Sequence, residues 1–203
     1  MTSVDYIVCC IGSGAVGKSS ITIRFCYNRF SGSYDPTLED SYKGQITVDN
    51  TKYFLNIIDT AGQEEYAGVR DCNMRDGTGF ILVYSIIDEK SFEEVATLHE
   101  QIYRTLDFEP EEQNVPIVLV ANKSDLESDR QVPKECGEDL AKKWGVPYLE
   151  VSAKENINIR RIFETVVKEM KKKPIISVTT QNAAAAQKAT KGKHKKGKKC
   201  VVV

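Results

Sequence analysis

The sequence predicts an α/β fold in which helices cover both faces of a mostly parallel, six-stranded sheet with one antiparallel edge strand. Short apolar runs alternate along the chain with segments of helical periodicity, the order expected of repeated strand–helix–strand units. Two runs, residues 80–86 and 115–121, are almost continuously apolar, as expected of strands buried on both faces. The chain has 203 residues, enough for one globular domain with a well-buried core.

A glycine separates the first predicted strand from the first predicted helix. Residues 4–11 form an apolar run that ends at Gly12, and residues 20–28 follow as a helix. Cys9 and Cys10 lie inside the run, where we interpret them as core side chains. The six cysteines include no C-x-x-C pair, and the first residues lack the basic and apolar regions of a secretory signal. We therefore expect reduced thiols.

A hairpin is predicted after this helix. Residues 45–49 and 53–58 have strand character and flank Asp49-Asn50, a dipeptide typical of tight turns. The order of elements places another helix between this hairpin and the strand at 80–86.

The next two helices have recognisable boundaries. Ser91 and Glu94 have the spacing of a capping box, which predicts that a helix begins at Ser91. A second helix is predicted over residues 134–144, and Gly145 followed by Pro147 predicts its end.

The last strand and helix precede a segment of different composition. Residues 148–151 form a short apolar run, and residues 159–170 place their apolar side chains on one helical face. Residues 181–199 are rich in Ala, Lys and Gly and contain no Phe, Tyr or Trp, so they cannot bury enough apolar surface to fold. We predict one domain over residues 1–173 and a disordered tail over residues 174–203.

The net charge of −1 hides a strong asymmetry. Residues 171–203 contain ten lysines and no acidic residue, whereas residues 1–170 contain 18 basic and 29 acidic residues and carry −11. This distribution excludes a uniformly basic nucleic-acid-binding protein. No apolar run reaches the roughly 20 residues needed to span a bilayer.

The strongest local motif is a G-x-x-x-x-G-K-S sequence between the first strand and the first helix. Its glycines allow backbone N–H groups to surround a phosphate, Lys18 adds a positive charge, and the Ser19 hydroxyl is suited to bind Mg²⁺. The preceding strand and following helix are the context in which this sequence binds phosphate. The motif comprises Gly12, Ser13, Gly14, Ala15, Val16, Gly17, Lys18 and Ser19.

A second polar segment, Asn122-Lys123-Ser124-Asp125, follows the strand at 115–121. Ligands bind at the carboxyl ends of strands in open α/β sheets, so this segment is expected beside the phosphate site. A carboxylate there accepts hydrogen bonds from N1–H and the exocyclic amine of guanine, whereas adenine has no donor at N1. The two motifs together favour GTP and GDP over adenine nucleotides.

A third segment, residues 59–63, follows the strand at 53–58. Asp59 at a strand end is suited to hold Mg²⁺ through water. Gly62 supplies a backbone N–H for a γ-phosphate, and Gln63 is suited to orient an attacking water. A solvated loop residue is an equally good interpretation of Gln63.

Together these motifs resemble the Ras branch of the small GTPases, whose G domain is a P-loop NTPase fold. Five segments agree with that family in order and spacing over residues 4–170, and the tail agrees as well. The segments are residues 12–19, Tyr34-Asp-Pro-Thr37-Leu-Glu-Asp-Ser-Tyr42, residues 59–63, residues 122–125, and Ser152-Ala153-Lys154.

The resemblance implies roles for individual residues. Thr37 would bind Mg²⁺ and the γ-phosphate, Tyr34 would close over the phosphates, and Phe30 would pack edge-on near the guanine. Lys123 and Lys154 would flank the base, and the Ala153 N–H would donate to its O6. The implied catalytic residues are Gln63, Lys18, Thr37 and Gly62, and the implied metal ligands are Ser19, Thr37 and Asp59. Beyond residues 12–19, the implied nucleotide-binding residues are Ser20, Phe30, Tyr34, Pro36, Thr37, Gly62, Asn122, Lys123, Asp125, Ser152, Ala153 and Lys154. The implied effector segment is Tyr34, Asp35, Pro36, Thr37, Leu38, Glu39, Asp40, Ser41 and Tyr42.

Three positions bear on the choice between the Ras and Rap branches and on the rates of nucleotide exchange and hydrolysis. Ala15 stands where Ras proteins usually have Gly, and its Cβ beside the phosphates is expected to alter exchange or hydrolysis in a direction that the sequence does not give. Gly14 is the small residue that the family needs for an arginine finger to enter. Gln63 stands where Rap relatives typically have Thr, which favours Ras over the alternative of a Rap-like GTPase.

The final residues, Cys200-Val-Val-Val203, form a C-a-a-X prenylation signal. Seven lysines lie within residues 188–199, and such a patch is the second signal that secures a single lipid on a membrane. Nucleic-acid binding is the rival interpretation of the lysines, disfavoured by the missing aromatic residues and by Cys200. We expect lipid anchoring at Cys200 on the cytoplasmic side of the plasma membrane, with farnesyl and geranylgeranyl both open.

Three classes of function fit these motifs: a GTPase switch, slow alone and controlled by partners, a metabolic P-loop kinase or ATPase, and a nucleotide-bound adaptor that no longer hydrolyses. No acceptor site or lid is recognised, which disfavours the second class, and Gln63, Gly62 and Thr37 disfavour the third. The resemblance implies a monomer that binds Mg²⁺ with GTP or GDP. Its implied partners are an exchange factor, a GTPase-activating protein, an effector with a Ras-binding domain and an anionic membrane, without nucleic acid.

Overall fold

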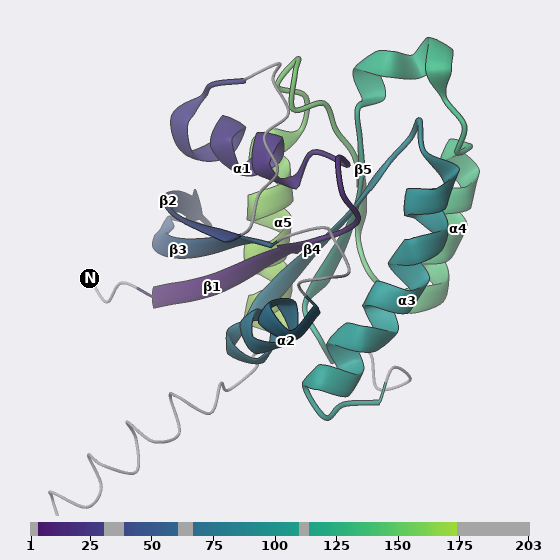
Figure 1. Ribbon diagram of the computed structural model, residues 1–203. Coiled ribbons are helices and arrows are strands. Elements are labelled where there is room, and N and C mark those ends of the chain that lie inside the picture. The colour runs from purple at the N-terminus through teal and green to yellow at the C-terminus, as the bar shows by residue number, and fades with distance from the viewer. Residues whose placement is uncertain (1–3, 31–38, 61–66, 110–113, 174–203) are drawn as a thin grey trace, which may run out of the picture.

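The structure is a computed structural model that describes residues 4–30, 39–60, 67–109 and 114–173. Its strands are β1 (Val4–Ile11), β2 (Glu39–Val48), β3 (Thr51–Thr60), β4 (Gly79–Ser85), β5 (Ile117–Asn122) and β6 (Tyr148–Glu150). They form one six-stranded sheet in the order β2-β3-β1-β4-β5-β6 (Figure 1). β2 and β3 are antiparallel, and every other neighbouring pair is parallel. The predicted α/β fold with one antiparallel edge strand is confirmed.

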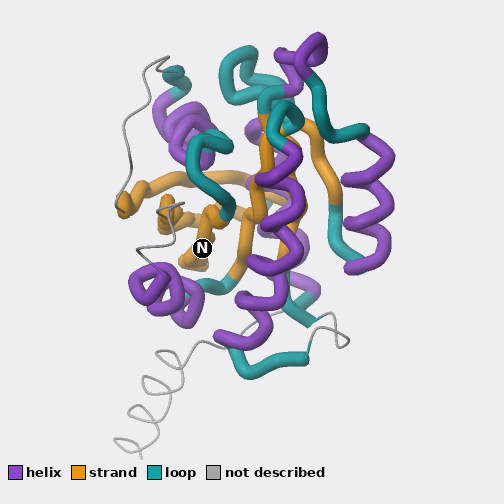
Figure 2. The backbone as a smooth tube through the Cα atoms, turned by 45° about the vertical axis from the view of Figure 1, so that its right-hand side comes forward, coloured by secondary structure: helices purple, strands orange, loops and turns teal. Residues whose placement is uncertain are grey.

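Helices cover both faces of this sheet (Figure 2). They are α1 (Lys18–Tyr27), α2 (Ala67–Asp76), α3 (Glu89–Thr105), α4 (Lys134–Trp144) and α5 (Ile159–Lys172), with a 3-10 helix, η3 (Ser124–Asp129). One apolar layer joins the sheet to α1 and α5, and a second layer joins it to α2, α3 and α4. None of the helices among the described residues has the length and apolarity to cross a membrane.

β1 contributes to both apolar layers. Val8 and Cys10 pack in the layer with α1 and α5, whereas Cys9 and Ile11 pack in the opposite layer. All four side chains are fully buried, as expected because successive side chains of a strand point to opposite faces. The prediction that Cys9 and Cys10 fill the core is confirmed, and neither forms a disulfide.

The hairpin of β2 and β3 turns at the predicted dipeptide. Asp49 and Asn50 have φ values of 49° and 59°, and Val48 pairs with Thr51 across the turn. Both residues are therefore left-handed, as a two-residue hairpin turn requires. β2 begins at Glu39, earlier than the predicted 45, because its polar first half continues the ladder with β3 as far as the Glu39–Thr60 pair.

The predicted capping box of α3 is wrong. The helix begins at Glu89, and its N-cap Asp88 accepts a hydrogen bond of 3.2 Å from the Ser91 N–H. The Ser91 hydroxyl donates to the Asp88 carbonyl at 2.7 Å, and Glu94 accepts from Ser13 in the phosphate loop instead of capping the helix. The predicted α4 is confirmed, and its C-cap Gly145 is left-handed with φ of 65°.

Candidate nucleotide-binding site

Four of the predicted segments meet at the carboxyl ends of the parallel strands. The phosphate loop, defined as residues 12–19, follows β1, and Asp59 lies at the end of β3. Asn122 ends β5, and Ser152-Ala153-Lys154 follows β6. These are the strand ends at which open α/β sheets bind ligands.

The phosphate loop curls around the ammonium group of Lys18. Lys18 Nζ donates hydrogen bonds to the carbonyl oxygens of Gly12 at 3.0 Å and Ser13 at 2.8 Å. The Lys18 side chain is buried, so these carbonyls compensate for its lost hydration. A Cβ at Gly12 would lie 2.2 Å from the Val83 carbonyl oxygen, so only glycine fits there. The loop thus holds a positive charge where phosphate is predicted to bind.

Three further positions shape the loop. Gly17 has φ of 95°, and a Cβ there would lie 2.4 Å from Asn122 Nδ2. Ala15 is exposed and left-handed with φ of 59°, a conformation that costs a non-glycine residue about 1 kcal/mol. A Cβ at Gly14 would meet nothing within 4 Å. Space therefore exists beside Gly14 and not beside Gly12 or Gly17.

Asp59 is fully buried at the end of β3. Burial raises the pKa of its carboxyl to about 6, although the Ser19 hydroxyl and the Lys18 charge act in the opposite direction. Neither carboxylate oxygen has a hydrogen bond of normal geometry within the described part of the chain. A buried carboxylate in this state fits a hard cation such as Mg²⁺, which prefers oxygen ligands and completes its shell with water and phosphate. Asp59 and Ser19 fit such a metal.

Asn122 connects the phosphate loop to the segment after β6. Its Nδ2 donates to the Val16 carbonyl at 2.9 Å, and its Oδ1 accepts from the Ala153 N–H at 3.3 Å. Asn122 is 2% exposed, so both bonds lie in the interior. The two segments predicted to bind phosphate and base are thus joined by one side chain.

The Asp125 carboxylate is fixed from two sides. The Ser152 hydroxyl donates to Asp125 Oδ1 at 2.6 Å, and Lys154 Nζ lies 4.0 Å from Oδ2. Lys123, between Asn122 and Asp125, is left-handed with φ of 68°, and burial lowers the pKa of its ammonium group. A fixed carboxylate flanked by two lysines is suited to bind a base with adjacent N–H donors.

The remaining predicted residues fall into two groups. Ser20 lies on α1, Phe30 is 40% exposed, and Glu39, Asp40, Ser41 and Tyr42 lie on β2. The other group lies outside the described residues and comprises Tyr34, Asp35, Pro36, Thr37, Leu38, Gly62, Gln63 and Cys200.

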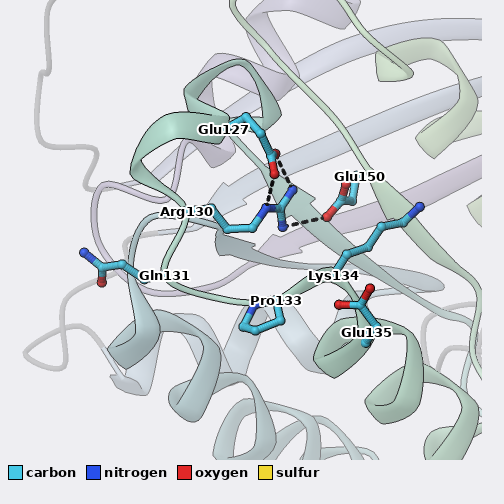
Figure 3. A pocket seen from close by; sticks show the side chains of 7 residues that line it. All are labelled: Glu127, Arg130, Gln131, Pro133, Lys134, Glu135 and Glu150. Atoms are coloured by element: carbon cyan, nitrogen blue, oxygen red, sulfur yellow. Dashed lines mark hydrogen bonds and ion pairs between the residues drawn. The ribbon is translucent and has the colours of Figure 1, made fainter.

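Two arginines that support the site were missed by the sequence analysis. Arg24 donates from α1 to the backbone of the segment after β6. Arg130 donates to both carboxylate oxygens of Glu127 at 2.8 and 2.7 Å and to Glu150 Oε1 at 2.9 Å (Figure 3). It therefore ties the end of η3, which begins beside Asp125, to β6. The Arg130–Glu127 pair is only three residues apart, but Glu150 and the Ala153–Lys154 backbone lie far from their arginines in the sequence and are brought to them by the fold.

The comparisons with known proteins concern the domain as a whole. The model of the Ras family matches residues 7–172. The chain is 48% identical over 168 residues to Ras-like protein 2 of Mucor circinelloides f. lusitanicus, covering 83% of each chain. It is also 48% identical to two Dictyostelium discoideum proteins, Ras-like protein rasC, covering 80% of this chain and 84% of the relative, and Ras-like protein rasB, covering 84% of each.

The region matched by the family model begins within β1 and runs to the end of α5. These matches support the Ras branch. Proteins of this family bind GTP and GDP, typically with Mg²⁺, and hydrolyse GTP to GDP. The chain therefore belongs to the Ras family of small GTPases.

Proposed function

We propose that this protein is a GDP/GTP switch in signal transduction, anchored by a lipid on the cytoplasmic side of the plasma membrane. The observation that carries the nucleotide part is the placement of the Asp125 carboxylate, held by Ser152 at 2.6 Å, beside a phosphate loop that encloses Lys18. Asn122 connects the phosphate loop at Val16 to Ala153, the residue next to the Ser152 that holds Asp125. A rigid site of this kind selects guanine because its hydrogen-bonding groups stay unpaired with adenine.

Different residues would have separate roles in the hydrolysis of GTP. Lys18 would neutralise the phosphates, and Gln63 would orient the water that attacks the γ-phosphorus while the bond to the bridging oxygen breaks, giving GDP and phosphate. Ser19, Thr37 and Asp59 would hold Mg²⁺, which supplies charge neutralisation at the β- and γ-phosphates when bound. The Gly62 N–H and Tyr34 would contact the phosphates, in line with the resemblance.

A GTPase-activating protein is proposed to supply the missing positive charge. The sequence offers no arginine in the position of an arginine finger, and the free space beside Gly14 leaves room for one to enter. In Ras proteins themselves such an arginine raises the rate by about 10³–10⁵. Intrinsic hydrolysis should therefore be slow.

Switching would use the segments next to the γ-phosphate. The γ-phosphate would order residues 30–42 and 61–76 and expose Leu38–Tyr42 to an effector with a Ras-binding domain, by strand pairing at the edge of the sheet. An exchange factor would restore GTP. The basic tail and Cys200 support the membrane anchor, because one lipid needs a second, electrostatic signal for stable binding.

The proposal is tested by single-turnover hydrolysis of GTP, with and without a Ras GTPase-activating protein. Gln63→Leu should abolish the acceleration, whereas the control Gln45→Leu, at the far end of β2, should hydrolyse like wild type. A fast unassisted turnover that persists in Gln63→Leu would contradict the mechanism.

A further inference from the structure

Arg24 reaches from α1 to the backbone of the segment predicted to contact guanine. Its Nε donates to the Ala153 carbonyl and its Nη2 donates to the Lys154 carbonyl, both at 2.8 Å. The planar guanidinium thus places two parallel N–H donors on two successive carbonyls, a geometry that the single ammonium of lysine cannot reproduce.

The same guanidinium contacts two more parts of the site. Nη1 lies 3.4 Å from the carbonyl oxygen of Asn28, the C-cap of α1. The guanidinium carbon is 5.8 Å from the centre of the Phe30 ring, within the range of a cation–π interaction. Arg24 therefore stands where α1, Phe30 and the Ala153–Lys154 backbone meet.

The two ends of Ala153 are held by different residues. Its carbonyl accepts from Arg24, and its N–H points to Asn122 Oδ1. Ala153 is 3% exposed, and its small side chain has no polar group to fix the peptide. The N–H belongs to the peptide group before the Ala153 Cα and is held by Asn122, whereas the carbonyl belongs to the peptide group after it and is held by Arg24. The two contacts together restrain the backbone on both sides of Ala153.

We propose that Arg24 is a positioning residue for guanine selectivity, which holds the Ala153–Lys154 backbone in place so that the Ala153 N–H, beside Asn122 Oδ1, can also donate to the 6-oxo group of the base. This inference rests on the proposed function and adds a residue that does not itself touch the nucleotide. A loosened Ala153–Lys154 segment would still admit a purine diphosphate but would discriminate poorly at position 6.

The test compares GDP with the diphosphate of 2,6-diaminopurine riboside, which carries an amino group in place of O6 and has no N1–H. Affinities and release rates are measured for wild type, Arg24→Ala, Arg24→Lys and the control Arg160→Ala. Arg160 is an exposed arginine of α5 that bonds to Glu164. Arg24→Ala should release GDP about 10- to 100-fold faster, because two charge-assisted hydrogen bonds are lost. Its preference for GDP over the analogue should fall by a similar factor.

The control and the conservative variant separate positioning from folding. Arg160→Ala should have the wild-type rate of GDP release and the wild-type preference for GDP. Both quantities for Arg24→Lys should lie between those of wild type and Arg24→Ala. If Arg24→Ala does not fold, Arg24→Lys is the variant that tests the inference. A variant that loses both ligands equally, or that keeps the wild-type preference, overturns the inference while the proposed function stands. A wild-type protein without preference for GDP over the analogue and over ADP overturns the proposed function itself.

Discussion

The side-chain amide of Asn122 donates a 2.9 Å hydrogen bond to the carbonyl oxygen of Val16, so the end of β5 is fastened to the middle of the phosphate loop. The amide oxygen of the same residue faces the Ala153 N–H. One buried side chain therefore links a residue that lies 106 positions before it in the sequence to a residue that lies 31 positions after it.

Asn122→Ala should weaken both folding and nucleotide retention. The substitution leaves the Val16 carbonyl without its donor, and an unsatisfied buried group of this kind costs about 1–3 kcal/mol. Urea denaturation should show the loss in the free energy of unfolding, and GDP release should accelerate. Asn56→Ala removes the exposed hydrogen bond from Ser41 and should change stability by less than about 0.5 kcal/mol. Equal effects of the two substitutions would contradict the role given to Asn122.

Ala15→Gly should stabilise the protein, although most alanine-to-glycine changes do the opposite. Ala15 is left-handed with φ of 59°, and relief of that strain is partly offset by the greater freedom of glycine in the unfolded chain. The net gain should be up to about 1 kcal/mol. Ala96→Gly, at an exposed position of α3, should instead cost about 1 kcal/mol. Thermal unfolding that gives both substitutions the same sign would show that the Ala15 strain is absent in solution.

The free energy of unfolding should decrease as the pH is lowered, because of His99. Its ring is buried, stacked on Trp144 with centroids 4.0 Å apart and tilted against Tyr103 at 4.9 Å. Burial lowers the pKa of His99 to about 4, whereas the unfolded chain titrates near its ordinary value of about 6.5. The unfolded state therefore binds the extra proton between these values, and up to about 3 kcal/mol is lost as the pH falls from 6.5 to 4. Urea unfolding of His99→Phe should show a shallower pH dependence, and equal slopes would refute this assignment.

Substitutions at the lipid-anchor cysteine and at the lysines of the tail should weaken membrane binding in two distinguishable ways. Cys200→Ser should release the protein to the cytosol at any salt concentration. Replacement of the seven lysines by Gln should weaken binding to anionic vesicles, with a difference from wild type that shrinks as salt rises, because the Debye length is only about 8 Å at physiological ionic strength. Cell fractionation that finds Cys200→Ser on the plasma membrane would exclude the tether. The lysines are residues 188, 191, 193, 195, 196, 198 and 199.

The elements predicted correctly from the sequence are those that depend on residues close together along the chain. The continuous apolar runs of β4 and β5, the turn at Asp49-Asn50 and the stop at Gly145 depend on near neighbours. The start of β2 was missed because residues 39–44 are polar and join the sheet through backbone bonds to β3. The start of α3 was misplaced because Asp88 competes with Ser91 for the cap.

The site shows the same division. The phosphate loop, Asp59, Asn122 and Asp125 lie at or directly after the ends of strands and carry recognisable spacing, so their neighbourhood was predictable. Arg24, Glu94 and Arg130 contact Ala153, Ser13 and Glu150, which are distant in the sequence and are brought near by the fold. Their roles emerge only from three-dimensional contacts.

The central claim, a guanine-selective site centred on Asp125, is tested most directly by competition titration of the wild-type protein with GTP and ATP in the presence of Mg²⁺. A site that leaves buried hydrogen-bonding groups unpaired with the wrong base should prefer GTP by roughly 10⁴–10⁵. Asp125→Asn should lose this preference and gain affinity for xanthosine triphosphate, because an amide donates to the 2-oxo group of xanthine where the carboxylate would repel it. Comparable affinity of the wild-type protein for ATP and GTP would contradict the account.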